Sequence, residues 1–245
     1  MKRRSSLVLG AALVAVAVVG LAACGGFAAG GGGDGSGTAT VWVTKDRGRT
    51  LVEKGTVPAG ETLLRGLRSL GDVDTTYGGR FVESISGVSG SRSGERDWFW
   101  FVNGLLGNTS AAEYRLHAGD VAWWDIRDWA KDYDTEVVVG AFPEPFLHGY
   151  GGHVRPAAVR YAPGERAGAR RIARVVRASS VAPLGTAVPS NANVLELVTG
   201  KPRFTAALRR QGTGPQGPVV FVYSGPVANL LPHGSRPYVR EFSVP

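Results

Sequence analysis

The stretch Asp97-Trp98-Phe99-Trp100-Phe101-Val102-Asn103-Gly104 carries the clearest structural signal in this chain. Asn-Gly after a run of aromatic and β-branched residues predicts a strand that ends in a tight hairpin turn, because both turn residues tolerate a positive φ. Side chains alternate along a strand, so Trp98, Trp100 and Val102 should point to one face and Phe99, Phe101 and Asn103 to the other. Both faces of this strand therefore carry large aromatic groups.

A second expected strand, Val121–Ile126, repeats the pattern, since Trp123 and Trp124 must point to opposite faces. A sheet with one face in solvent would alternate apolar with polar residues. This sheet does not, so its second face must be covered. The cover could be the C-terminal half of the chain, a partner protein or a bulky ligand, and the sequence leaves these alternatives open.

Residues 38–130 predict a small α+β domain around these strands. Thr40–Thr44 and Leu51–Val57 should pair as a hairpin, and Phe81–Val88 is expected to be extended. Leucines recur at helical spacing through Glu61–Leu70, with Gly71 placed to end a helix. We expect this helix to cover one face of the sheet.

A polar segment, Lys131–Asp134, marks an expected boundary before a second, mixed α/β domain at residues 135–245. One helix is expected at Gly164–Ala178, where arginines gather on the outer face, and Lys201–Arg210 could be a strand or a helix. The strands expected in this part are Glu136–Val139, Ala157–Tyr161, Val194–Val198, Pro218–Tyr223 and Tyr238–Val244.

The N-terminus has the plan of an export signal, with a basic start and then the uncharged apolar run Leu7–Leu21. Leu21-Ala22-Ala23-Cys24 resembles the lipobox of bacterial lipoproteins, and Cys24 is the single cysteine. The resemblance implies a signal peptide at 1–23, lipidation of Cys24, and a protein held on the extracytoplasmic face of the membrane. Residues 24–37 are rich in glycine and should form a tether. The alternative is a secreted protein whose cysteine lies near the cleavage site by chance.

Four segments together resemble the transcobalamin C-terminal-like domain of bacterial surface proteins: Val57–Leu64, Ile85–Val88, Trp98–Gly104 and Ala112–Val121. This resemblance covers residues 38–130 and implies a β-grasp-like fold, similar to the β-domain of transcobalamin and intrinsic factor. It also implies a cobalamin-like ligand and a partner, either a helical-repeat protein or a vitamin transporter. The residues it implies as ligand-binding candidates are Trp98, Trp100, Asn103, Tyr114, Trp123 and Trp124.

Other function classes have less support in the sequence. The formal charge is +8, but the anchor would place a basic face near anionic envelope components, so we expect no nucleic-acid partner. His148 and His153, with Glu144 nearby, match no standard metal motif, and we expect neither a metal nor a catalytic site. The sequence thus favours an extracytoplasmic binding lipoprotein. The alternative is an envelope adhesion or protein-interaction module without a small-molecule ligand.

Overall fold

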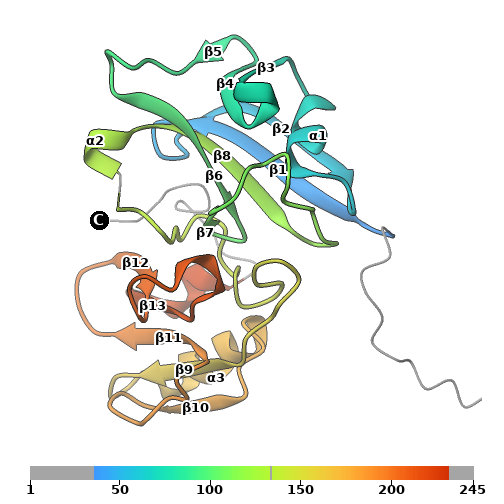
Figure 1. Ribbon diagram of the computed structural model, residues 1–245. Helices are drawn as coiled ribbons and strands as arrows, with labels where there is room; N and C mark the ends of the chain where they lie inside the picture. Colours follow the sequence, from blue (N-terminus) through green and yellow to red (C-terminus); the bar gives the residue numbers. More distant parts are fainter. Residues whose placement is uncertain (1–35, 133, 232–245) are drawn as a thin grey trace, which may run out of the picture. The chain divides into compact units, whose positions relative to one another are not determined.

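A computed structural model describes residues 36–132 and 134–231, which are mostly β-sheet with few helices (Figure 1). The predicted signal peptide, the lipobox with Cys24, most of the tether and the expected strand Tyr238–Val244 lie outside the described residues. The described residues form, in chain order, β1 (Thr38–Lys45), β2 (Thr50–Pro58), α1 (Leu63–Arg68), β3 (Val73–Thr76), η1 (Tyr77–Gly79), β4 (Phe81–Ile85), β5 (Val88–Ser89), β6 (Arg96–Val102), β7 (Leu105–Leu106), β8 (Val121–Asp128), α2 (Trp129–Asp132), β9 (Ala157–Tyr161), α3 (Arg166–Val175), β10 (Ser180–Pro183), β11 (Asn193–Val198), β12 (Arg203–Leu208), η2 (Gly214–Gln216), β13 (Val219–Ser224) and η3 (Val227–Leu230).

The first half of the chain forms a five-stranded mixed sheet in the order β2-β1-β8-β6-β7. The predicted hairpin is present as antiparallel β1 and β2, while β1 runs parallel to β8 and β6 runs antiparallel to it. The helix α1 is shorter at both ends than the predicted range Glu61–Leu70, and Ser69 rather than Gly71 ends it. Its start is set by Thr62, whose Oγ1 accepts a hydrogen bond from the Arg65 backbone N–H at 3.3 Å.

The predicted alternation along β6 is confirmed. Trp98, Trp100 and Val102 belong to the large hydrophobic core, which we call the core face of the sheet. Phe101 belongs to a separate small cluster on the opposite side, which we call the second face. At the end of β6, Asn103 (φ 53°) and Gly104 (φ 79°) form the predicted turn, which leads into β7. The second-face cluster consists of Trp42, Phe99, Phe101, Leu106, Trp123 and Val138.

The chain itself covers part of this second face. The Leu106 backbone N–H donates to the Glu136 carbonyl at 2.9 Å, and the Val138 backbone N–H donates to the Gly104 carbonyl at 2.8 Å. These bonds hold Val138 against the aromatic rings of the second face. The prediction of a strand at Glu136–Val139 is nevertheless wrong, because the segment forms only an isolated bridge, between Val137 and Leu105. It borders β7, which is only two residues long and offers little edge for pairing.

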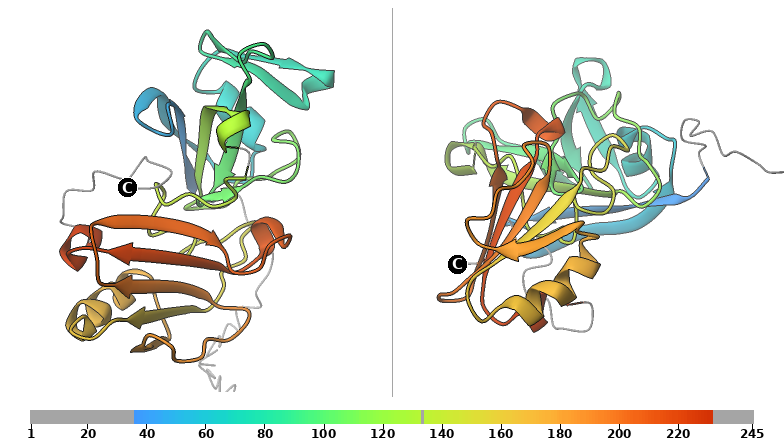
Figure 2. Two further views of the ribbon diagram at one scale, coloured as in Figure 1. Left: turned by 90° about the vertical axis from the view of Figure 1, so that its left-hand side faces the viewer. Right: turned by 90° about the horizontal axis from the view of Figure 1, so that it is seen from below.

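A second five-stranded sheet follows in the order β10-β9-β11-β13-β12. Its strands β10, β9, β11 and β13 are parallel, and β12 is an antiparallel edge strand, so Lys201–Arg210 contains a strand rather than a helix. The views in Figure 2 show α3 lying along one face of this sheet. Its own residues Ala169, Ile172 and Ala173 are buried. The short edge strand β10 was not predicted, because its sequence lacks a clear alternating pattern.

The outer face of α3 is basic, as predicted. Its exposed arginines are Arg166, Arg170, Arg171, Arg174 and, just after the helix, Arg177. No helix among residues 36–132 and 134–231 is both long and apolar enough to cross a membrane.

A small three-stranded sheet, in the order β3-β4-β5, completes the first half. The predicted extended segment Phe81–Val88 is split into β4 and β5 by a turn at Ser86 (φ 47°) and Gly87 (φ 76°). Buried residues from this sheet and from both five-stranded sheets belong to one hydrophobic core.

Candidate functional site

The aromatic residues that the sequence analysis proposed as ligand contacts are buried in this structure. Their exposed fractions are 6% for Trp98, 8% for Trp100, 8% for Tyr114, 0% for Trp123 and 1% for Trp124. Trp100 packs against Trp124 and Tyr114 on the core face, whereas Trp123 packs against Trp42 and Phe101 on the second face. The aromatic strands therefore build the protein interior, and Tyr114, which lies between β7 and β8, also lines a cavity.

Asn103, the sixth candidate, is fully buried and joins two distant loops. Its Nδ2 donates to Asp120 Oδ1 at 2.7 Å and to the Gly149 carbonyl at 2.6 Å. Its Oδ1 accepts from the Val121 backbone N–H at 2.8 Å. Because the Asn103 side-chain amide makes all three hydrogen bonds, it holds the Gly149 loop against the end of β6.

Tyr114 extends the same network toward the 149–152 loop. Its hydroxyl donates to Asp120 Oδ2 at 3.4 Å and accepts from the Gly151 backbone N–H at 3.1 Å. Its ring lies 5.0 Å from the Tyr150 ring, centroid to centroid. Burial raises the pKa of the Tyr114 hydroxyl and the pKa of the Asp120 carboxyl, although the hydrogen bonds to Asp120 oppose the shift of the latter. Tyr114 is therefore a neutral hydrogen-bonding group at physiological pH.

Two histidine–carboxylate pairs border this network. His148 Nδ1 lies 2.6 Å from Glu144 Oε1, and the His148 backbone N–H donates to Glu144 Oε2 at 3.0 Å. His117 Nδ1 lies 3.6 Å from Asp120 Oδ2. Burial raises the pKa of Glu144, and His148 partly offsets this. Across the described ranges, no cluster of three or more His, Cys, Asp or Glu residues could hold a metal ion.

Two cavities share Tyr150 in their walls and together form what we call the Tyr150 groove. One has a volume of about 330 Å³ and the other about 400 Å³, and both are lined by Tyr150, His153 and Gln216. The larger cavity adds Tyr114 and His117 to its wall. The smaller cavity has a largely apolar wall, with the added residues Leu105, Pro145, Val154, Arg155, Pro156, Asn193 and Pro215.

Sequence reasoning found some of these groove residues and missed others. The resemblance implies Tyr114 as a ligand contact, and His153 stands out in the sequence with His148, although the pair matches no metal motif. Arg155 and Gln216 carry no recognisable motif. They meet because the Arg155 guanidinium donates hydrogen bonds to the backbone carbonyls of Gln216 and Asn191. A pairing across so many residues has no signature in a single sequence.

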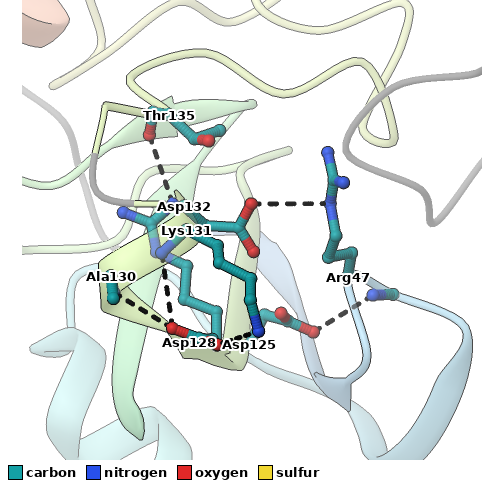
Figure 3. Close-up of polar contacts among 9 residues, drawn as sticks. Arg47, Asp125, Asp128, Ala130, Lys131, Asp132 and Thr135 are labelled. Atoms are coloured by element: carbon teal, nitrogen blue, oxygen red, sulfur yellow. Dashed lines mark hydrogen bonds and ion pairs between the residues drawn. The ribbon is translucent and has the colours of Figure 1, made fainter. Parts of the chain in front are cut away.

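A separate polar cluster lies beside the second face of the first sheet (Figure 3). Asp125 is fully buried and accepts from Thr44 Oγ1 at 2.5 Å and from the Gly48 backbone N–H at 3.1 Å. Arg127 is also buried and donates to the Thr135 carbonyl at 3.4 Å, and its guanidinium lies 3.9 Å from the centroid of the Phe99 ring. Desolvation raises the pKa of Asp125 to about 6.

Comparison with known proteins gives a family match to part of the first half of the chain. A family described as a domain of unknown function (DUF4430) matches residues 60–127. A crystal structure of a proposed metal binding protein from Ruminococcus gnavus ATCC 29149 is 16% identical, with a TM-score of 0.30, and the match covers 38% of this chain and 97% of that one. No curated protein matches the sequence. The matched family segment contains Tyr114, His117 and Asp120 but none of the 144–153 loop.

Proposed function

We propose that this chain is a membrane-anchored binding lipoprotein on the extracytoplasmic face, which captures a bulky amphipathic ligand in the Tyr150 groove for uptake. The observation that carries the proposal is the pair of adjoining cavities that share Tyr150, His153 and Gln216. Their volumes lie within the range of small-molecule sites, roughly 300–1,000 Å³. The proposal is for binding, and it assigns no catalytic residue.

The chemistry of the groove suits a ligand with both apolar and polar edges. Tyr150 and Tyr114 line the groove with largely buried rings, 6% and 8% exposed, while prolines and valine line the smaller cavity. His117, His153 and Gln216 can exchange hydrogen bonds with peripheral amides. A cobalamin-like corrin has this character but is larger than either cavity. It would therefore leave surface exposed for a partner, either a helical-repeat protein or a vitamin transporter.

The strand arrangement supports a relationship to β-grasp domains, which is part of the proposal. The observations in its favour are the order β2-β1-β8-β6, the hairpin at its start and the parallel pairing of β1 with β8. The matched segment 60–127 overlaps the part of the chain that resembles the transcobalamin C-terminal-like domain. In this interpretation the Tyr150 groove combines residues of that domain with the loop that follows it.

Ligand capture is tested by titrating the full chain with cyanocobalamin, alone and with any helical-repeat protein encoded beside it. We expect binding that Tyr150→Ala weakens about tenfold or more, since the ring lines both cavities. Trp129→Ala removes an exposed aromatic side chain away from the groove and should leave affinity unchanged. Absence of binding under both conditions would exclude the cobalamin ligand.

The anchor is tested separately. Expression with a radiolabelled fatty acid should label the wild-type chain, and Cys24→Ser should abolish the label and release the protein from membranes. An unlabelled, uncleaved wild-type chain would contradict the lipoprotein proposal.

A second candidate function, contact with an anionic envelope surface, is favoured by the exposed arginines along α3. Cosedimentation with vesicles containing phosphatidylglycerol tests it. If the candidate is correct, the double variant Arg170→Ser/Arg174→Ser should bind less at low salt, and added salt should remove the difference. Equal binding of both proteins would leave these arginines as a solvated helix face.

A further inference from the structure

The small β3-β4-β5 sheet carries a cavity that is separate from the Tyr150 groove. It has a volume of about 550 Å³ and shares no lining residue with the two groove cavities. We call it the β3–β5 cavity. Its wall includes Tyr77, Phe81, Glu83, Ser91, Arg92 and Asp97.

Two aromatic side chains on this wall are unusually exposed. The exposed fraction is 72% for Tyr77 and 39% for Phe81, whereas the tryptophans of β6 and β8 are buried. Tyr77 also has a left-handed backbone (φ 51°), and Gly78 (φ 70°) and Gly79 (φ 89°) continue the turn. This conformation costs a bulky residue on the order of 1–3 kcal/mol, and such strain concentrates at ligand sites. The turn therefore exposes an aromatic ring to solvent at a backbone position where an asparagine or aspartate would have a lower conformational energy.

The polar groups around these rings include both signs of charge. Glu83 and Asp97 offer carboxylate oxygens, Arg92 offers guanidinium N–H groups, and Ser91 can donate or accept. Arg92 already lies over this wall, because its Nη2 donates to the Tyr77 hydroxyl at 3.3 Å. The two carboxylates would repel an anionic ligand, and Arg92 would repel a cationic one. A neutral ligand with many hydroxyl groups can use all of these donors and acceptors.

Asp97 differs from a fully solvated carboxylate. Burial raises its pKa, while Arg92 and a backbone hydrogen bond lower it, and the first effect is the largest. A partly desolvated acceptor forms stronger hydrogen bonds than one in bulk water. Asp97 directly precedes Trp98, which the core holds in place, so its position is fixed by β6.

We propose that the β3–β5 cavity binds a neutral oligosaccharide. The rings of Tyr77 and Phe81 pack against the C–H faces of the sugar units, and Glu83, Asp97 and Arg92 form hydrogen bonds with the hydroxyl groups. Pyranose rings combine an apolar face with a rim of hydroxyls, which matches this pairing of exposed aromatic and mixed polar groups. This site is independent of the Tyr150 groove and of the ligand proposed there.

Calorimetric titration of the full chain tests the proposal with three neutral probes: chitotriose, maltotriose and mannotriose. We expect at least one to bind, and Tyr77→Ala to weaken that binding about tenfold or more. Glu83→Gln should weaken it less, because the amide oxygen still accepts a hydrogen bond. Trp129→Ala and Tyr150→Ala should leave it unchanged, which separates this site from the groove. Circular dichroism of each variant confirms that it is folded.

Two charged probes sharpen the test: a trigalacturonate and a glucosamine trimer. We expect both to bind more weakly than the best neutral trisaccharide. The proposal is overturned if none of the neutral probes binds, if a charged probe binds as tightly as the best neutral one, or if Tyr77→Ala binds as well as the wild type.

Discussion

The two faces of the first five-stranded sheet carry similar aromatic residues but have different surroundings. On the core face, Trp98, Trp100 and Trp124 join a hydrophobic core that includes residues of all three sheets. On the second face, Phe101 and Trp123 belong to a small cluster bordered by the buried polar residue Asp125. The comparison shows that equal hydrophobicity on two faces does not imply equal roles. One face supplies the bulk of the packing, and the other combines packing with buried charge.

The largest effect on stability should come from removing a large side chain from the core face. Trp124→Ala removes a side chain that is 1% exposed and packs against Trp100. We expect the free energy of unfolding to fall by roughly 3–5 kcal/mol, because a large cavity replaces the indole. Denaturant unfolding measures this loss, and Trp129→Ala, at an exposed position, should change stability by less than about 0.5 kcal/mol. Similar losses in the two variants would show that the core face is not the main packing surface.

Much of this comparison could be predicted from the sequence, since alternation along a strand directly determines which side chains share a face. The hairpin turn at Asn103-Gly104 and the opposite directions of Trp123 and Trp124 are confirmed on that basis. The cover of the second face could not be predicted in detail. Residues 136–138 have a β-rich composition but form only a bridge to β7 and two flanking hydrogen bonds, one with β7 and one with the turn before it.

The candidate site was harder to predict than the fold. The resemblance directed attention to the aromatic strands, yet their tryptophans form the interior. The groove arises where Tyr114 meets Tyr150 and Gln216, which are far apart in the chain and are brought together by Asn103, Arg155 and the 149–152 loop. Local patterns report on strands and helices, whereas this meeting depends on long-range hydrogen bonds.

At the end of β6, Asn103 joins the sheet to the loop beside the groove. Asn103→Ala would leave Asp120, the Gly149 carbonyl and the Val121 N–H without their present partner. We expect a loss of roughly 2–4 kcal/mol in the free energy of unfolding. Gln211→Ala, at an exposed amide side chain that does not line the Tyr150 groove, serves as the control and should lose about 0.5 kcal/mol or less. Hydrogen exchange of the 149–152 amides should increase only in the first variant.

The buried carboxylate near the second face should make stability depend on pH. Burial raises the pKa of Asp125 to about 6 from its usual 3.8, so the folded state takes up this proton before the unfolded chain as the pH falls. The charged form therefore destabilises the fold above pH 6, and this penalty disappears as the pH falls toward 4. Asp125→Asn should raise the free energy of unfolding by roughly 1–3 kcal/mol at pH 8 and by much less at pH 4.

Asp128 is the matched control for that experiment. The hydrogen bond from Lys131 lowers the pKa of Asp128, so its ionised form stabilises the fold at neutral pH and loses that effect in acid. Asp128→Asn should therefore give no gain at pH 8. A gain from Asp125→Asn that is equal at pH 4 and pH 8 would contradict the assignment of the penalty to charge.

The smallest expected effect is a difference in stability between substitutions of two adjacent tryptophans that lie on opposite faces. Trp123 Nε1 donates to Thr44 Oγ1 at 2.7 Å, whereas Trp124 Nε1 is buried and has no hydrogen-bond partner among the described residues. Replacement of either indole by phenylalanine loses some packing, but only Trp123→Phe also breaks a hydrogen bond. We expect Trp123→Phe to destabilise the protein by about 1 kcal/mol more than Trp124→Phe, as measured by denaturant unfolding. Equal losses, or a larger loss at Trp124, would mean that packing volume alone distinguishes the faces and that the polar cluster beside Trp123 contributes nothing to holding its ring.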